Sequence, residues 1–204
     1  MMVKGRLNPL ELHVISHSAQ QFDDLSFRWK QAAPWVDYFH LRQKEKTPDE
    51  VLQLGRQILK KNVIPSSSFI INQHIEVALK LNCVGVHLPE AVTINQVQKS
   101  GLRWGRSVHS IESAKWAEQV GADYVMFGHI FSSASKPGQI PRGLSQLTQI
   151  VQAVKIPVIA VGGIHAENVA DVAKTGCAGI AIISALLKDD PQVVVQDLKR
   201  RWTE

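Results

Sequence analysis

A histidine stands where parallel α/β proteins usually carry their chemistry. The segment Gly105–Phe131, GRSVHSIESAKWAEQVGADYVMFGHIF, is typical of strand, helix and strand, and His129 follows its second strand directly. Histidine has an ordinary pKa of about 6.5, so it can give or take a proton at neutral pH. The carboxyl ends of strands are the usual catalytic positions of parallel barrels. His129 is therefore the candidate catalytic residue.

The other histidines are weaker candidates because no second feature supports them. His13 and His40 fall inside strand-like runs, where they are expected to be structural. His17, His87 and His109 also fall near the expected mouth, but none has a second feature that supports it as far as His129 is supported. The segment 129–142 contains two prolines and a glycine and is interpreted as an active-site loop.

Strand-like and helix-like segments alternate along the whole chain. The eight apolar runs are Leu10–Ser16, Val36–Arg42, Phe69–Asn72, Val84–Leu88, Arg103–Ser107, Tyr124–Gly128, Val158–Gly162 and Gly179–Ile183. Amphipathic stretches such as Pro48–Lys61, Ser110–Val120 and Ala166–Lys174 lie between them. Eight such units predict a compact (β/α)8 barrel over residues 10–204, after a short mobile tail at residues 1–9. A flavodoxin-like open sheet is the alternative.

Polar residues end several of the predicted strands, and a barrel would gather them at one mouth. Arg42, Asn72 and Ser107 are the candidate substrate-binding residues, joined by Lys136 from the long loop. Arg42 is favoured because it ends a run, VDYFHL, that must enter the barrel, and a guanidinium binds carboxylates and phosphates. The competing interpretation of each cation is a solvated loop charge, and this applies most to Lys44 and Lys136.

The last two strand ends predict a phosphate site. Gly162 ends the seventh run and Gly163 follows it, where the missing Cβ atoms let backbone approach an anion. Ile183 ends the eighth run, and Ser184 begins the helix-prone SALL. Barrels often bind phosphate after these two strands. The competing interpretation of the glycine pair is a tight turn.

Composition narrows the class of protein. The net charge is +5, which suits an anionic substrate, yet the basic residues are scattered, so nucleic-acid binding is not expected. No apolar run is long enough for a membrane span, and the N-terminus lacks a signal sequence, so a cytoplasmic protein is expected. Cys83 and Cys177 are interpreted as reduced packing residues. Five tryptophans favour, weakly, a small homo-oligomer.

Several motifs together resemble the thiamine phosphate synthase superfamily, from Leu12 to Leu187. They are HLRQK, the IIN of the third run, GRSVHS, GADYVMFGHIF and IPVIAVGGI with GIAIIS. The resemblance is stronger to the thiazole tautomerase branch, the TenI-type proteins, which carry a histidine where this chain has His129. It implies an isomerase that needs no metal or other cofactor. In that reaction, a proton shift through His129 makes the ring of a thiazole carboxylate phosphate aromatic.

Two alternatives remain beside the tautomerase. A thiamine phosphate synthase is a magnesium-dependent transferase, and the resemblance implies acidic residues after the third and fourth strands. This chain has Asn72 and Gln73 at the first place and only Glu90 at the second, which argues against that alternative. The other alternative is a regulatory protein that binds the thiazole phosphate without catalysis.

Overall fold

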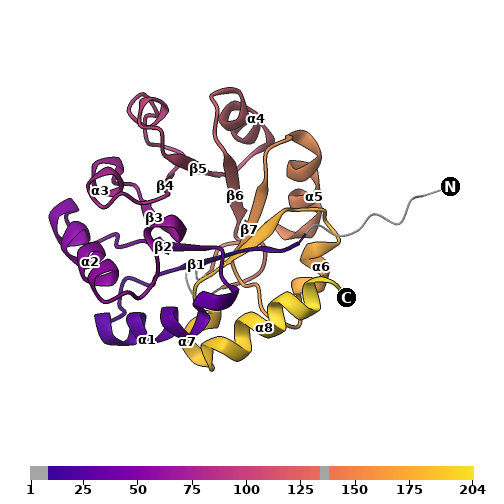
Figure 1. Ribbon diagram of the computed structural model, residues 1–204. Coiled ribbons are helices and arrows are strands. Elements are labelled where there is room, and N and C mark those ends of the chain that lie inside the picture. The colour runs from indigo at the N-terminus through magenta and orange to yellow at the C-terminus, as the bar shows by residue number, and fades with distance from the viewer. Residues whose placement is uncertain (1–8, 134–137) are drawn as a thin grey trace.

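Eight parallel strands close into a barrel in the computed structural model, which describes residues 9–133 and 138–204 (Figure 1). The strands are β1 (Glu11–Ile15), β2 (Tyr38–Leu41), β3 (Phe69–Asn72), β4 (Gly85–Leu88), β5 (Arg103–Val108), β6 (Tyr124–Gly128), β7 (Val158–Val161) and β8 (Gly179–Ile182). They run round the barrel in chain order, and β1 pairs with β8. The predicted (β/α)8 barrel is confirmed, and the open sheet is excluded because every described strand has two neighbours. The predicted tail lies outside the described residues except for Pro9.

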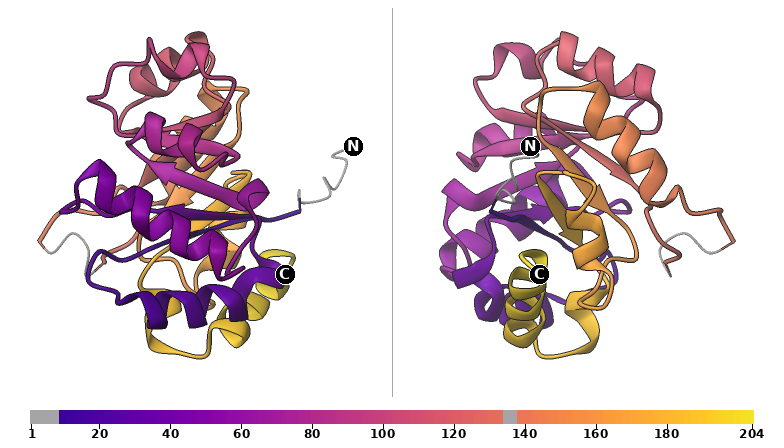
Figure 2. Two further views of the ribbon diagram at one scale, coloured as in Figure 1. Left: turned by 60° about the vertical axis from the view of Figure 1, so that its left-hand side comes forward. Right: turned by 90° about the vertical axis from the view of Figure 1, so that its right-hand side faces the viewer.

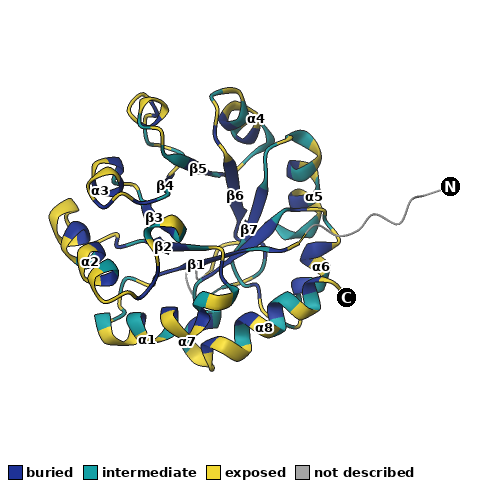
Figure 3. Cartoon of the chain, viewed as in Figure 1, coloured by how far each residue is buried: buried dark blue, intermediate teal, exposed yellow. Residues whose placement is uncertain are grey.

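Helices cover the outside of the barrel, with their exposed faces outward (Figure 3). They are α1 (Phe22–Ala32), α2 (Pro48–Lys60), α3 (Ile75–Lys80), α4 (Ile111–Gln119), α5 (Gly143–Ala153), α6 (Val169–Ala173), α7 (Ala185–Lys188) and α8 (Pro191–Trp202). Short 3-10 helices occur at Ala33–Trp35, Ser66–Ser68 and Val97–Lys99. The final helix, α8, packs beside α1 (Figure 2), so helices from the two ends of the described chain lie next to each other.

Local sequence sets where the longer helices begin. Thr47 caps α2, because its side chain accepts from the backbone N–H of Glu50 while the Glu50 carboxylate accepts from that of Thr47. Ser110 caps α4 in the same way, and Asp190 caps α8 through two backbone N–H groups. These caps fix the point at which the chain leaves each strand end and turns into a helix.

The apolar core is divided between two layers. The larger layer lies between the strands and the helices and includes the fully buried Trp29 and Trp202. A smaller apolar cluster fills part of the barrel interior, around Tyr124, Met126 and Ile159. The remainder of the interior is polar, which the apolar strand pattern does not predict.

Cysteine burial agrees with the sequence. Cys83 and Cys177 are buried and form no disulfide in the described part of the chain. Burial raises the pKa of the Cys83 thiol to about 12 and also raises that of Cys177.

No helix among the described residues is long and apolar enough to cross a membrane. Of the tryptophans considered for an oligomer interface, Trp29, Trp104 and Trp202 are buried, whereas Trp116 is 42% exposed.

Candidate active site

A cavity of about 620 Å³ opens at the carboxyl ends of the strands. The structure brings together there every predicted site residue that it describes. These residues are Arg42, Asn72, Ser107, His129, Gly162, Gly163, Ile183 and Ser184. Lys136 lies outside the described residues. The strand ends therefore converge as expected of a parallel barrel, and the cavity is large enough for a small-molecule substrate.

His129 is almost fully buried, at 6% exposure, and lines the cavity directly after β6. Its Nε2 atom lies 3.3 Å from the backbone carbonyl oxygen of Gln139. A carbonyl oxygen only accepts hydrogen bonds, so Nε2 carries a proton in this contact. In the neutral ring Nδ1 then keeps its lone pair. The long loop thus fixes the tautomer of His129 and leaves one nitrogen able to accept a proton.

The glycine pair after β7 is packed against the segment after β6. Gly162 has a φ of +102°, and a Cβ atom there would overlap the Cα and Cβ atoms of His129. Gly163 has a φ of +69°, and its Cβ would lie 2.6 Å from the carbonyl oxygen of Ser132. The sequence predicts that these glycines let the backbone approach an anion. In the structure they also let the backbone after β7 pass close to His129 and Ser132.

Backbone N–H groups at the last two strand ends can receive an anion. Among the described residues, the N–H groups of Gly163 and Ser184 have no hydrogen-bond acceptor, and both residues line the cavity. Both residues are half-buried at the open mouth, so their N–H groups are free to donate to a bound anion.

Arg42 is held at the cavity by β1. Its backbone N–H donates to Ser16 Oγ over 2.8 Å, and the Ser16 hydroxyl donates to the Arg42 carbonyl oxygen over 3.1 Å. Burial lowers the pKa of the guanidinium, which nevertheless remains a cation at neutral pH. Lys44 also lines the cavity and is exposed. The mouth therefore presents positive charge as well as unpaired N–H groups, which favours an anionic ligand.

Sequence analysis missed the residues behind the predicted ones. His40 contacts Asn72, and His87 contacts Ser107 over 2.9 Å, so two substrate-binding candidates rest on buried histidines. His13, His40 and His87 each fall in a strand among apolar residues, as ELHVI, YFHL and GVHL. That repeated placement was the available signal for a polar barrel interior.

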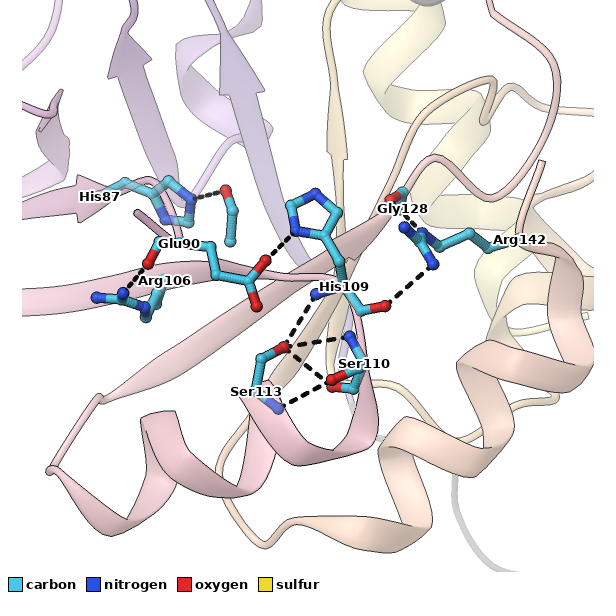
Figure 4. A network of polar contacts seen from close by, with 9 residues as sticks. His87, Glu90, Arg106, His109, Ser110, Ser113, Gly128 and Arg142 are labelled. Carbon is cyan, nitrogen blue, oxygen red and sulfur yellow. Dashed lines mark hydrogen bonds and ion pairs between the residues drawn. The ribbon is translucent and has the colours of Figure 1, made fainter. Parts of the chain in front are cut away.

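A second missed group joins the loops beside His129 (Figure 4). Arg142 donates from Nε to the carbonyl oxygen of Gly128 over 3.2 Å and from a terminal nitrogen to that of His109 over 3.0 Å. His109 Nδ1 lies 2.5 Å from the Glu90 carboxylate, and Arg106 donates to the Glu90 carbonyl oxygen. Partial burial raises the pKa of Glu90, but hydrogen bonds led by that from His109 outweigh it and lower the pKa overall. This network holds the backbone that carries His129.

Comparison with known proteins places these features in a family. A model described as thiamine monophosphate synthase matches residues 12–186. The chain belongs to this family. A thiamine-phosphate synthase of Pyrococcus horikoshii is 38% identical over 164 residues, covering 78% of this chain and 79% of the relative. One of Methanoregula boonei is 36% identical over 174 residues, covering 82% and 81%. A solved thiamine phosphate pyrophosphorylase of Pyrococcus furiosus superposes with a TM-score of 0.78 at 29% identity, covering 96% of each chain.

Family membership confirms the resemblance at its broad level and corrects the enzyme class. The curated relatives are named thiamine-phosphate synthases, which are transferases. The expected isomerase class, and with it the tautomerase description, is therefore wrong by this comparison. The prediction placed weight on one histidine after β6, and that residue alone does not determine a reaction class.

The magnesium ion that the synthase resemblance implies does not fit the residues at the mouth. Among the described residues, no group of three or more Asp, Glu, His or Cys side chains could hold a metal ion. Asn72 ends β3 and Gln73 follows it, and both carry amides in place of carboxylates. The Glu90 carboxylate already forms a hydrogen bond with His109. Magnesium prefers carboxylate oxygens together with substrate phosphates, so this protein supplies too few ligands by itself.

Proposed function

We propose that this chain is a transferase of the thiamine-phosphate synthase type. It would form a bond between a phosphorylated thiazole and a pyrimidine that carries a pyrophosphate. The bond between the pyrimidine and its pyrophosphate would break, and pyrophosphate would leave. The observation that carries the proposal is the 38% identity to a thiamine-phosphate synthase over 78% of this chain, in a barrel whose cavity collects the predicted site residues. The family model spans residues 12–186, which include the strand ends that line the cavity, so the likeness covers the site as well as the fold.

The phosphate of the thiazole would lie at the ends of β7 and β8. The N–H groups of Gly163 and Ser184 would donate to its oxygens, with Gly162 and Ile183 forming the wall. Support comes from the lack of other acceptors for these two groups in the described part of the chain. An oxygen anion is a strong acceptor for backbone N–H groups, because hydrogen bonds to ionised groups exceed neutral ones in strength.

The leaving pyrophosphate would face the cations at the end of β2. Arg42 and Lys44 line the same cavity, and the bond-breaking electron pair departs with the pyrophosphate, where negative charge grows. Asn72 and Ser107 would orient the ring systems between the two phosphate ends. Because the protein offers no carboxylate cluster, no step is assigned to a metal ion.

His129 is proposed to orient a substrate in the site. Its Nε2–H is committed to the carbonyl oxygen of Gln139, so Nδ1 is the atom that could accept a hydrogen bond from a bound substrate. Joining the two rings with loss of pyrophosphate removes no proton from either substrate, so no acid–base step is assigned to His129. Its contact with Gly162 supports a position next to the proposed thiazole phosphate.

A coupling assay tests the proposal. The full chain is incubated with the thiazole phosphate and the pyrimidine pyrophosphate, with magnesium in one arm and EDTA in the other, and thiamine phosphate is measured by chromatography. Product in either arm supports the transferase. Absence of product in both arms refutes it, even if the protein isomerises a thiazole carboxylate phosphate.

A second candidate is a protein that binds the thiazole phosphate without catalysis. The observation that favours it is the pair of amides, Asn72 and Gln73, at the strand end where the synthase resemblance implies an acid. Calorimetric binding of the thiazole phosphate without turnover in either arm would favour this candidate. A failure to bind would exclude both candidates.

A further inference from the structure

A chain of hydrogen bonds crosses the barrel interior from the amino end of β1 to the mouth. The Glu11 carboxylate lies 2.8 Å from His13 Nε2, and His13 Nδ1 lies 2.8 Å from His40 Nε2. His40 Nδ1 then lies 3.2 Å from the side-chain oxygen Oδ1 of Asn72. Arg103 donates to the same Glu11 oxygen over 2.8 Å. In each of these hydrogen bonds one of the two atoms must carry the hydrogen and the other must accept it.

The charge of Glu11 sets the direction of the first two links. Burial raises the pKa of Glu11, but hydrogen bonds and charges from His13 and Arg103 lower it to about 2, so the group is a carboxylate and only accepts. His13 Nε2 must therefore donate to it. Burial lowers the pKa of His13, which keeps the ring neutral with a lone pair on Nδ1.

The same reasoning carries the direction to Asn72. His13 Nδ1 needs a donor, so the hydrogen lies on His40 Nε2. Burial, assisted by neighbouring charges, holds the pKa of His40 well below its ordinary value, so that ring is neutral and Nδ1 has a lone pair. A lone pair cannot bond to an amide oxygen, yet Asn72 Oδ1 is the atom that lies at His40 Nδ1 in the structure. The oxygen and nitrogen of an amide are assigned by their partners, so we assign the NH₂ group to this position and the oxygen to the cavity side.

A second chain ends at Ser107. The hydroxyl oxygen of Tyr124 lies 3.2 Å from His87 Nδ1, and His87 Nε2 lies 2.9 Å from Ser107 Oγ. Tyr124 is fully buried, and burial raises its pKa, so the hydroxyl keeps its hydrogen. Within the described residues that hydrogen has one acceptor, His87 Nδ1. His87 then donates from Nε2 to Ser107, whose own hydroxyl hydrogen is left for the cavity.

We infer that the barrel interior fixes the hydrogen-bonding polarity of the mouth: Glu11, His13 and His40 make Asn72 an acceptor, whereas Tyr124 and His87 make Ser107 a donor. Both residues line the cavity. A ligand that fits therefore presents a donor to Asn72 and an acceptor to Ser107. A ligand with the opposite pattern leaves buried groups unpaired, which costs roughly 5- to 150-fold in affinity per group. The five interior residues are positioning residues, because they act through the two that face the ligand.

Nitrogen NMR of the full chain tests this inference without any substrate, so its outcome is independent of the proposed transferase activity. Histidine is labelled with ¹⁵N, and single His→Gln variants assign the rings. Long-range ¹H–¹⁵N spectra at pH 7.5 then report which nitrogen of each ring carries the hydrogen. We expect His13, His40 and His87 to carry it on Nε2. A hydrogen on His40 Nδ1 would overturn the assignment of Asn72, and one on His87 Nδ1 would overturn that of Ser107.

Two variants distinguish an effect of hydrogen-bond direction from an effect of side-chain packing alone. Glu11→Gln can donate as well as accept, so we expect part of the His40 population to shift its hydrogen to Nδ1 while His87 is unchanged. Tyr124→Phe removes the donor to His87, so we expect the His87 signals to shift while His40 is unchanged. Equal disturbance of both rings in either variant would show that the residues act only through packing. The wild-type spectrum decides the tautomers even if a variant does not fold.

Discussion

Lowering the pH from 7.5 to 5.5 should destabilise this protein through the histidines inside its barrel. His87 is 3% exposed, and burial, with a contribution from nearby positive charge, lowers its pKa to about 3. His40 is fully buried, and its pKa also lies well below the ordinary value. In the unfolded chain each ring has a pKa near 6.5. The unfolded state therefore binds protons that the folded state does not bind, and the free energy of unfolding falls as the pH drops below about 6.5.

The size of the effect follows from this difference in proton binding. A ring that titrates at about 6.5 when unfolded, and not at all when folded, costs about 1.4 kcal/mol between pH 7.5 and 5.5. His40 and His87 together cost about 3 kcal/mol, and His13 adds to the loss because its pKa is also lowered by burial. That is a large part of the roughly 5–15 kcal/mol that holds a domain folded. For a chain of this length it lowers the melting temperature by about 6–12 °C.

Urea unfolding followed by tryptophan fluorescence at pH 7.5, 6.5 and 5.5 measures the effect, because Trp29 and Trp202 are buried in the native state. His87→Gln should reduce the loss between pH 7.5 and 5.5 by about 1.4 kcal/mol. His165→Gln, at an exposed position, is the matched control and should keep the wild-type loss. A free energy of unfolding that does not fall with pH would refute the reasoning, as would an unchanged loss in His87→Gln.

Three further predictions concern the site and the core. His129→Asn should lower any turnover about 100-fold with little change in melting temperature, and steady-state kinetics with full turnover would contradict its role in orienting the substrate. Gly121→Ala, at φ +88° with open space around it, should cost about 1–2 kcal/mol of folding free energy in urea titrations. Gly163→Ala should cost clearly more, because of the contact with Ser132, and equal costs would contradict that account. Cys83 and Cys177 should react with a thiol reagent only on unfolding, and stoichiometric labelling of the native protein would contradict their burial.

The barrel could be predicted because each strand is marked by a short apolar run in the sequence itself. The runs Phe69–Asn72 and Tyr124–Gly128 coincide with β3 and β6. Once parallel strands alternate with helices, the strand ends must converge, so the gathering of Arg42, Asn72 and His129 follows from topology alone. Residue type and position in a strand were sufficient for that step.

The supports of the site could not be predicted in the same way. Arg142 reaches the backbone of Gly128 across 14 positions, and that contact depends on how the intervening loop closes. The pairing of His13 with His40 depends on the register between β1 and β2, which no single strand reveals. Enzyme class was the largest error, because one histidine at a strand end is compatible with many reactions.

The contact between Gly162 and His129 has a consequence for how this site can change over generations. The backbone after β7 lies so close to His129 that any side chain at position 162 would have to displace it. The atoms in the way are the Cα and Cβ of His129, and every residue other than glycine carries both, so a smaller side chain at position 129 does not make room. A side chain at position 162 becomes possible only if the backbone after β6 moves. Selection for new specificity is therefore expected to leave Gly162 unchanged and to act on the other residues that line the cavity.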